Sequence, residues 1–150
     1  KGDVSNAKQQ VSDSIKLPQV IELARQTAII KQDSISKINS LIEIFESVNS
    51  CQNTNSDNDQ RIKISNDNIK QLNIDIENIN SLRTQLQNGE QELAIVKDVL
   101  TIFELNSNLR AATEAVISIH DSAVAENNQI ITDTQSAQNE LDACQKTNNE

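Results

Sequence analysis

The chain has 150 residues, a formal net charge of −9 at pH 7, two Gly, one Pro and two aromatic residues, both of them Phe. So few Gly and Pro residues cannot form the many turns of a β-barrel or β-sandwich. Its apolar runs are much shorter than the roughly 18 residues of a transmembrane helix, and the negative charge disfavours nucleic acids and anionic membranes. The length fits a single domain over residues 1–150.

The first apolar residues have the spacing of a short amphipathic helix. They are Val4, Ala7, Val11 and Ile15. Pro18 follows closely, and proline lacks the amide hydrogen that an interior helical residue donates, whereas the first turn of a helix accepts it. We therefore predict a short helix at about 2–16, a break at 16–18 and a new helix that begins near Pro18.

Three long amphipathic helices are predicted after Pro18, because aliphatic residues recur there at alternating spacings of three and four. These helices cover about residues 18–51, 58–88 and 108–145. A polar stretch rich in Asn, Ser and Asp predicts a loop at 52–57, and a second polar stretch predicts a tail at 145–150.

Two weaker signals lie between the second and third long helices. Asn88-Gly89 favours a left-handed helix end, and Asn106-Ser107-Asn108 favours a turn. With both breaks, a short helix remains at about 90–105. Its apolar side consists of Leu93, Val96, Leu100 and Phe103. Continuous helix is the alternative, because the apolar spacing runs through both signals and a helical Gly costs only about 1 kcal/mol relative to Ala.

Cys51 and Cys144 are the only sulfur-containing residues, and their wide separation without Cys-x-x-Cys spacing favours one structural disulfide over a redox or zinc motif. A helix rises about 1.5 Å per residue, so two cysteines on antiparallel helices meet only if the paths to and from the turn are equally long. Breaks at both Gly89 and Asn106 balance the paths. A single break at either position leaves an excess of about 17 residues, or roughly 25 Å.

The predicted fold is therefore all-α: an elongated antiparallel helical bundle of three long helices, with the short helices at about 2–16 and 90–105 at its base. A disulfide between Cys51 and Cys144 would join the opposite end. Because disulfides persist in oxidising compartments, we expect a secreted or extracellular protein. The alternative is a cytoplasmic bundle with two buried free thiols.

No group of residues predicts catalysis, a cofactor or a metal ion. His120 is the only histidine, and it lies at the edge of the apolar stripe, about 36 Å from Cys144 along a continuous helix. The carboxylates are scattered over polar faces. Asp57-Asn58-Asp59 lacks the Gly and the closing Glu of a calcium loop, which favours a helix cap. We therefore expect a protein that is not an enzyme.

The apolar stripe is the remaining candidate for a functional surface. Several aliphatic residues lie off its main seams, and a group of such residues would form an interface. They are Ile29, Ile64, Ile74, Leu105 and Val124. We expect a non-enzymatic domain that acts by protein binding or self-association. The alternatives are a carrier of lipid or a small apolar ligand in the aliphatic core, and a structural coiled-coil domain.

Overall fold

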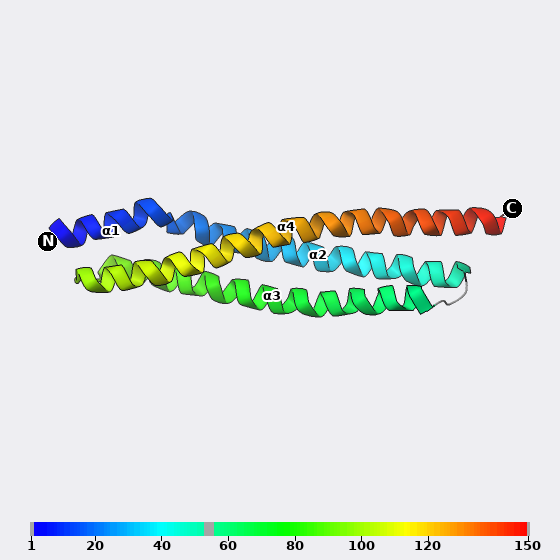
Figure 1. Cartoon of the computed structure of the whole chain (residues 1–150), viewed down its shortest axis with the longest axis horizontal. Helices are drawn as coiled ribbons and strands as arrows, with labels where there is room; N and C mark the ends of the chain where they lie inside the picture. The colour runs from blue at the N-terminus through cyan, green and yellow to red at the C-terminus, as the bar shows by residue number, and fades with distance from the viewer. Residues whose placement is uncertain (1, 53–55, 150) are drawn as a thin grey trace. The chain divides into compact units, whose positions relative to one another are not determined.

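A computed structural model describes residues 2–52 and 56–149 of the chain. These residues are 97% helical and contain no strand. They form α1 (Gly2–Ile15), α2 (Leu17–Gln52), α3 (Ser56–Ile95) and α4 (Val99–Asn149). Three of these helices are long and pack as a helical bundle (Figure 1), which confirms the predicted all-α class.

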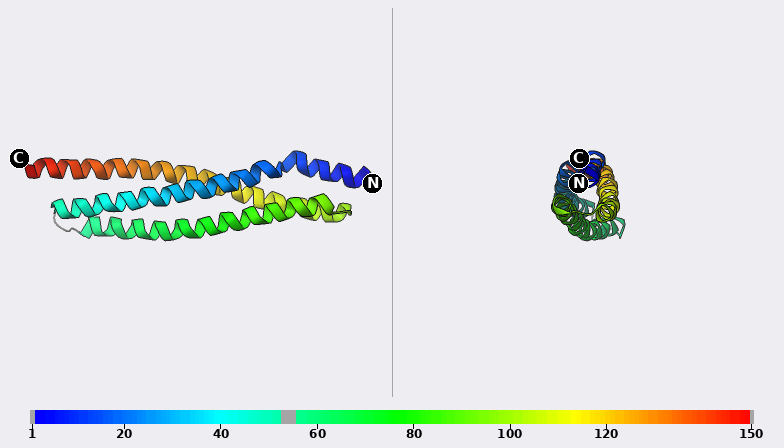
Figure 2. Two further views of the ribbon diagram at one scale, coloured as in Figure 1. Left: turned by 180° about the vertical axis from the view of Figure 1, so that it is seen from behind. Right: turned by 90° about the vertical axis from the view of Figure 1, so that its left-hand side faces the viewer.

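The chain divides into two compact units. Unit 1 consists of Lys1–Ile29 and Glu77–Ser122, and unit 2 of Ile30–Ile76 and Ala123–Glu150. Within unit 2, the parts of α2, α3 and α4 lie side by side and successive helices run in opposite directions (Figure 1 and Figure 2). Unit 1 contains α1 and the remaining parts of the long helices. The single domain over residues 1–150 stays a prediction.

The break between α1 and α2 lies where Pro18 predicts it. Among the described residues other than glycine, Lys16 alone has a left-handed backbone, with φ of 58°. Its amide donates to the carbonyl of Ser12 at 3.1 Å, and its carbonyl accepts from the amide of Gln19 at 3.0 Å. A left-handed residue ends a helix, and Pro18 fits the first turn of the next one because that turn needs no amide donor. Lys16 therefore closes α1 and opens α2.

Gly89 lies inside α3 and does not end it, so the predicted break there is wrong. The side chain of Leu109, in α4, occupies the space that a Cβ atom on Gly89 would take. Leu109 belongs to the buried core of unit 1. Glycine is therefore present here because the two helices approach closely, and not because the backbone turns.

The break predicted at Asn106 is also wrong, because α4 continues through this residue. The chain turns instead at residues 96–98, where Asp98 caps α4. Its carboxylate accepts hydrogen bonds from the backbone amide of Thr101 at 2.9 Å and from the Thr101 hydroxyl at 2.6 Å. These bonds lower the pKa of Asp98. The separate helix predicted at 90–105 is therefore wrong, since its residues belong to α3, the turn and α4.

The turn at residues 96–98 still satisfies the length condition for the disulfide. Nearly equal lengths of chain separate Cys51 from Val96 and Asp98 from Cys144. A single turn midway between the cysteines makes the two path lengths equal. Two turns placed symmetrically about the midpoint have the same effect. Two features of the sequence therefore indicate the correct position of the turn: the midpoint between the cysteines, and the helix-capping pair Asp98 and Thr101.

The polar segments differ in part from their predicted form. Residues 53–55, in the loop predicted at 52–57, lie outside the described residues, whereas Gln52, Ser56 and Asp57 are helical. The predicted tail at 145–150 is solvent-exposed over residues 145–149, as its composition indicates, but these residues extend α4. Residue 150 lies outside the described part of the chain.

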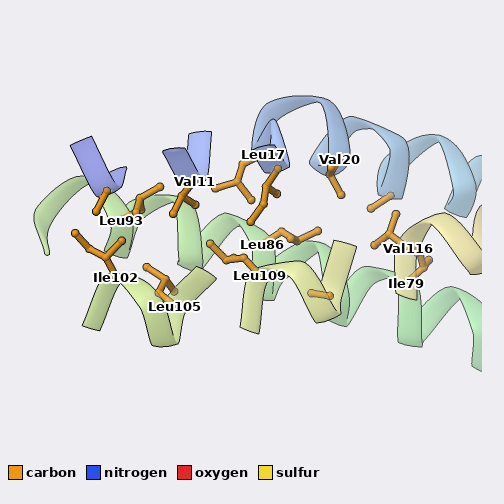
Figure 3. Close-up of a cluster of buried hydrophobic side chains, with 14 residues drawn as sticks. Val11, Leu17, Val20, Ile79, Leu86, Leu93, Ile102, Leu105, Leu109 and Val116 are labelled. Carbon is orange, nitrogen blue, oxygen red and sulfur yellow. The ribbon is translucent and has the colours of Figure 1, made fainter. Parts of the chain in front are cut away.

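Aliphatic side chains form the core of unit 1 (Figure 3). Val11 of α1, Leu93 of α3 and Ile102 of α4 point toward one another in this view, and all three belong to one buried cluster. The buried residues of α3 and α4 in this cluster recur every seven positions. They are Ile79, Leu86 and Leu93 on α3, and two such series on α4, which are Ile102, Leu109 and Val116, and Leu105 and Ala112. This spacing keeps one side of each helix on the core.

Two smaller clusters form the core of unit 2. The first is built around Leu72 and Ile130, and the second around Leu41, Phe45 and Ala137. Asn58 is buried beside the second cluster. Its amide donates to the backbone carbonyl of Phe45 at 2.6 Å, so this residue connects α3 to α2.

We predict that Gly89→Ala lowers the free energy of unfolding by about 1–3 kcal/mol, the usual cost of overpacking. This loss outweighs the gain of about 1 kcal/mol in helix propensity. Urea denaturation followed by circular dichroism measures the change. Gly2→Ala is the control, because a Cβ atom at Gly2 meets nothing within 4 Å. In a Leu109→Ala background the Gly89 substitution should cost less, and an equal cost in both backgrounds would contradict the packing explanation.

Candidate functional site

Cys51 at the end of α2 and Cys144 in α4 form a disulfide, with their Cα atoms 6.3 Å apart. This agrees with the disulfide predicted from the two widely separated cysteines. The side-chain amide of Asn148 donates to the backbone carbonyl of Cys51 at 3.3 Å, beside the bond. The disulfide closes a sequence separation of 93 residues within unit 2 and is compatible with an extracellular location.

Peptide mapping without reduction is expected to yield one cross-linked pair, containing Cys51 and Cys144 of the same chain. Reduction should lower the free energy of unfolding by about 4–5 kcal/mol, because a long closed loop restricts the unfolded chain. A Cys51→Ser/Cys144→Ser variant provides the control and should not respond to the reductant. Free thiols, or a pair that links two chains, would contradict the assignment.

The predicted interface residues do not all lie at the surface. Ile29, Ile64, Ile74 and Val124 are exposed. Leu105 is only 8% exposed, so its expected exposure is wrong. Because α4 continues through Asn106, Leu105 lies one helical turn before Leu109 on the buried side and joins the core of unit 1.

Other exposed apolar residues were not anticipated. Ile95, Leu100 and Phe103 lie around the turn at residues 96–98 in unit 1, and they are 57–75% exposed. Leu100 and Phe103 were expected on the buried side of a separate short helix. In the continuous α4, the positions of Ile102 and Leu105 set the buried side, and Leu100 and Phe103 lie outside it. Ile117 and Ile131 are also exposed.

Polar side chains interrupt the buried seam of α2. Its buried residues recur at alternating spacings of three and four, and three successive members are polar: Thr27, Lys31 and Ser34. The residues in this series are Leu17, Val20, Ala24, Thr27, Lys31, Ser34, Ile38, Leu41, Phe45 and Val48, and Ile35 is buried beside them. The spacing of three and four continues through the polar positions, so the sequence itself indicates that they lie on the buried side of α2.

Lys31 is buried and joins the three helices of unit 2 through two ion pairs. Its side chain is 4% exposed, and its ammonium lies 3.0 Å from the carboxylate of Asp75 in α3 and 3.4 Å from that of Glu126 in α4. Both carboxylates retain some contact with solvent. Burial of a charged group is expensive unless its partners are well placed, so the arrangement favours one alignment of the three helices over its alternatives.

Asn127 continues the polar layer formed by Lys31, Asp75 and Glu126 toward the surface. Its amide donates to the hydroxyl of Ser34 at 2.9 Å and to the carboxylate of Asp33 at 3.1 Å, while its carbonyl accepts from Lys37 at 2.8 Å. The hydrogen bonds from Lys37 and then Asn127 lower the pKa of Asp33. These polar groups satisfy one another, which indicates a role in alignment of the helices.

We predict that Lys31→Met has little effect on the free energy of unfolding or raises it, because methionine avoids the cost of burying an ammonium group. Asp75→Asn should destabilise by about 1–3 kcal/mol, since the buried charge of Lys31 loses its nearer partner. Glu126→Gln is the matched comparison and should cost less, because its carboxylate is farther from Lys31 and more exposed. A larger loss for Lys31→Met than for Asp75→Asn would contradict this account.

A surface groove lies between α3 and α4 in unit 2, with a volume of about 300 Å³. We call it the α3–α4 groove. Its apolar floor consists of Ile38, Leu41, Phe45, Ile130 and Ala137. Its rim consists of Arg61, Ile64, Asn68, Asp133, Ser136 and Glu140. The hollow exists because Ser65 and Ala137 are buried but short, so that α3 and α4 do not fill the space above α2.

Charged groups order one side of the α3–α4 groove. The guanidinium of Arg61 lies over the ring of Phe45, 5.5 Å from its centroid, and it pairs with the carboxylate of Glu140. The first contact is a cation–π interaction. Asp133 accepts a hydrogen bond from the neutral amide of Gln129 at 2.9 Å. The three ionised rim groups therefore have a net negative charge.

Groups that could support chemistry are dispersed. Within residues 2–52 and 56–149, no three His, Cys, Asp or Glu side chains converge as a metal site. The Nδ1 atom of His120 lies 3.7 Å from the carboxylate of Asp121, at a half-buried position. Along the described parts of the chain, no helix combines the length and the apolar character needed to cross a membrane.

Comparisons with known proteins provide no information on the function of the chain. Comparison with protein-family models, with curated proteins and with solved structures gave no match. The all-helical fold defines the structural class of the chain. The α3–α4 groove and the exposed apolar residues are the features that bear on its function.

Proposed function

We propose that this chain is a non-enzymatic, secreted or extracellular helical-bundle domain that binds another protein at the α3–α4 groove. The observation that carries the proposal is the exposed Ile64 beside a hollow with an apolar floor and a polar rim. Protein interfaces commonly combine an apolar centre with such a rim. The groove is open, and its shape suits a side chain presented by a partner.

Packing of the core favours protein binding over transport of an apolar ligand. Val48 and Leu72, both in unit 2, are each 1% exposed because neighbouring side chains cover them. A carrier needs space within its core, and small-molecule sites enclose most of their ligand. The groove has the volume of a small ligand site but is open to solvent, so an anchor side chain suits it better than an enclosed lipid.

The extracellular location is proposed from the disulfide. Cys51 and Cys144 have no metal-binding or redox-motif spacing, and their bond joins two helices. Such structural disulfides occur mainly in oxidising compartments. An extracellular domain of this kind would meet its partner in an oxidising environment, which preserves the disulfide.

The test is recovery of proteins from extracellular fluid of the source organism by the immobilised chain, measured by quantitative mass spectrometry. We predict that at least one protein is recovered about tenfold less by Ile64→Ser than by the unaltered chain, because the exposed apolar contact beside the hollow is lost. Ile74→Ser is the matched control: Ile74 lies on the same helix and is 50% exposed, against 49% for Ile64, but it lies outside the groove. Equal recovery by both variants would contradict the proposal.

A further inference from the structure

We infer that the partner presents a basic amphipathic helix to the α3–α4 groove, with an aliphatic side chain seated on the groove floor. This inference rests on the proposed protein-binding function and adds the chemistry of the partner. Three properties of the groove support it: its size, the exposure of Ile64 and the charge of its rim.

The size and lining of the groove suit an aliphatic anchor. A volume of about 300 Å³ is at the lower end of the range for ligand pockets. Ile38 and Leu41 form part of its floor, and the short buried residues Ser65 and Ala137 also line it. Leucine or isoleucine from a partner would fill the hollow that these short residues leave, and would replace water over an apolar surface.

Ile64 provides a second apolar contact next to the hollow. It is 49% exposed at the rim, on α3. The groove runs between α3 and α4. A helix of the partner that lies along the groove would cover Ile64 and insert its own anchor side chain next to Ile64. Amphipathic helices bind hydrophobic grooves in this way, with anchors three, four or seven residues apart.

The charge of the rim selects a basic partner. Glu140 and the ring of Phe45 already engage the Arg61 guanidinium, whereas Asp133 contacts the neutral amide of Gln129. Lysine or arginine beside the anchor would pair with Asp133, and an acidic helix would be repelled. A second copy of this chain would bring an identical negative rim against the first, so the charge disfavours self-association through this groove.

The test is selection from a displayed library of helical peptides against the full-length, disulfide-bonded chain. Each peptide has a fixed aliphatic stripe, and its flanking positions carry Lys or Glu with equal frequency. We expect peptides eluted from the unaltered chain to have an excess of Lys at these positions, and peptides eluted from Ile64→Ser to lack this excess. An excess of Glu, no charge bias, or no enrichment over Ile64→Ser would overturn the inference.

Affinities of one enriched peptide then test the geometry. Fluorescence polarisation should show an affinity about tenfold weaker for Ile64→Ser, as expected for an interface anchor, and nearly unchanged for Ile74→Ser. Asp133→Asn should weaken binding by a smaller factor and reduce its dependence on salt, because one charge pair is lost. An equal loss for Ile74→Ser, or an unchanged salt dependence for Asp133→Asn, would overturn the assignment to this groove. Circular dichroism confirms that each variant remains helical.

The two proposals fail in different ways. If a natural protein is recovered in an Ile64-dependent manner but selected peptides carry no basic excess, protein binding stands and the basic helix is wrong. If sedimentation equilibrium shows a dimer of the unaltered chain that Ile64→Ser abolishes, the occupant is a second copy and the basic helix is again wrong. If Ile64→Ser changes neither the selected peptides nor the recovery of proteins, both proposals fail.

Discussion

Burial of aliphatic side chains at seven-residue intervals is the interaction on which the rest of the structure depends. In unit 1, Leu86 and Leu93 of α3 share one core with Ile102 and Leu109 of α4. A helix whose buried residues repeat in this way keeps one side on the core along its length. That requirement overrides local signals for helix ends, because continuous helices bury these residues together whereas a break would rotate some of them into solvent. It also directs Phe103 outward.

Most exceptions to aliphatic burial lie in unit 2, although Thr27 of unit 1 is also buried. Lys31 lies at a position of the α2 seam where an apolar residue is expected, and it forms ion pairs with carboxylates of α3 and α4. Its desolvation is costly, so its value lies in alignment of the helices more than in stability. Ser65 and Ala137 are exceptions of a different kind, because they are too short to fill their positions. The polar side chains around Lys31 thus favour one alignment of the helices, and the short residues leave the groove unfilled.

Several features were predictable because they depend on local chemistry or on length alone. Pro18 marks the break before α2 because it lacks an amide hydrogen, and the cysteines constrain where the chain turns. The wrong breaks at Gly89 and Asn106 have one physical cause. A local preference for a turn is worth about 1 kcal/mol, which packing easily exceeds. Glycine at position 89 reports the proximity of Leu109, a contact that no local pattern contains.

The sequence by itself determined the helical class and the exposure of Ile64, and it favoured a disulfide between the two cysteines, because periodicity, side-chain polarity and chain length act along one chain. Tertiary structure decided the burial of Leu105 and the existence of the α3–α4 groove. Both depend on which residues of different helices meet. A hollow arises only where short side chains such as Ser65 and Ala137 fail to fill the space between helices, and volume between helices is a property of their packing.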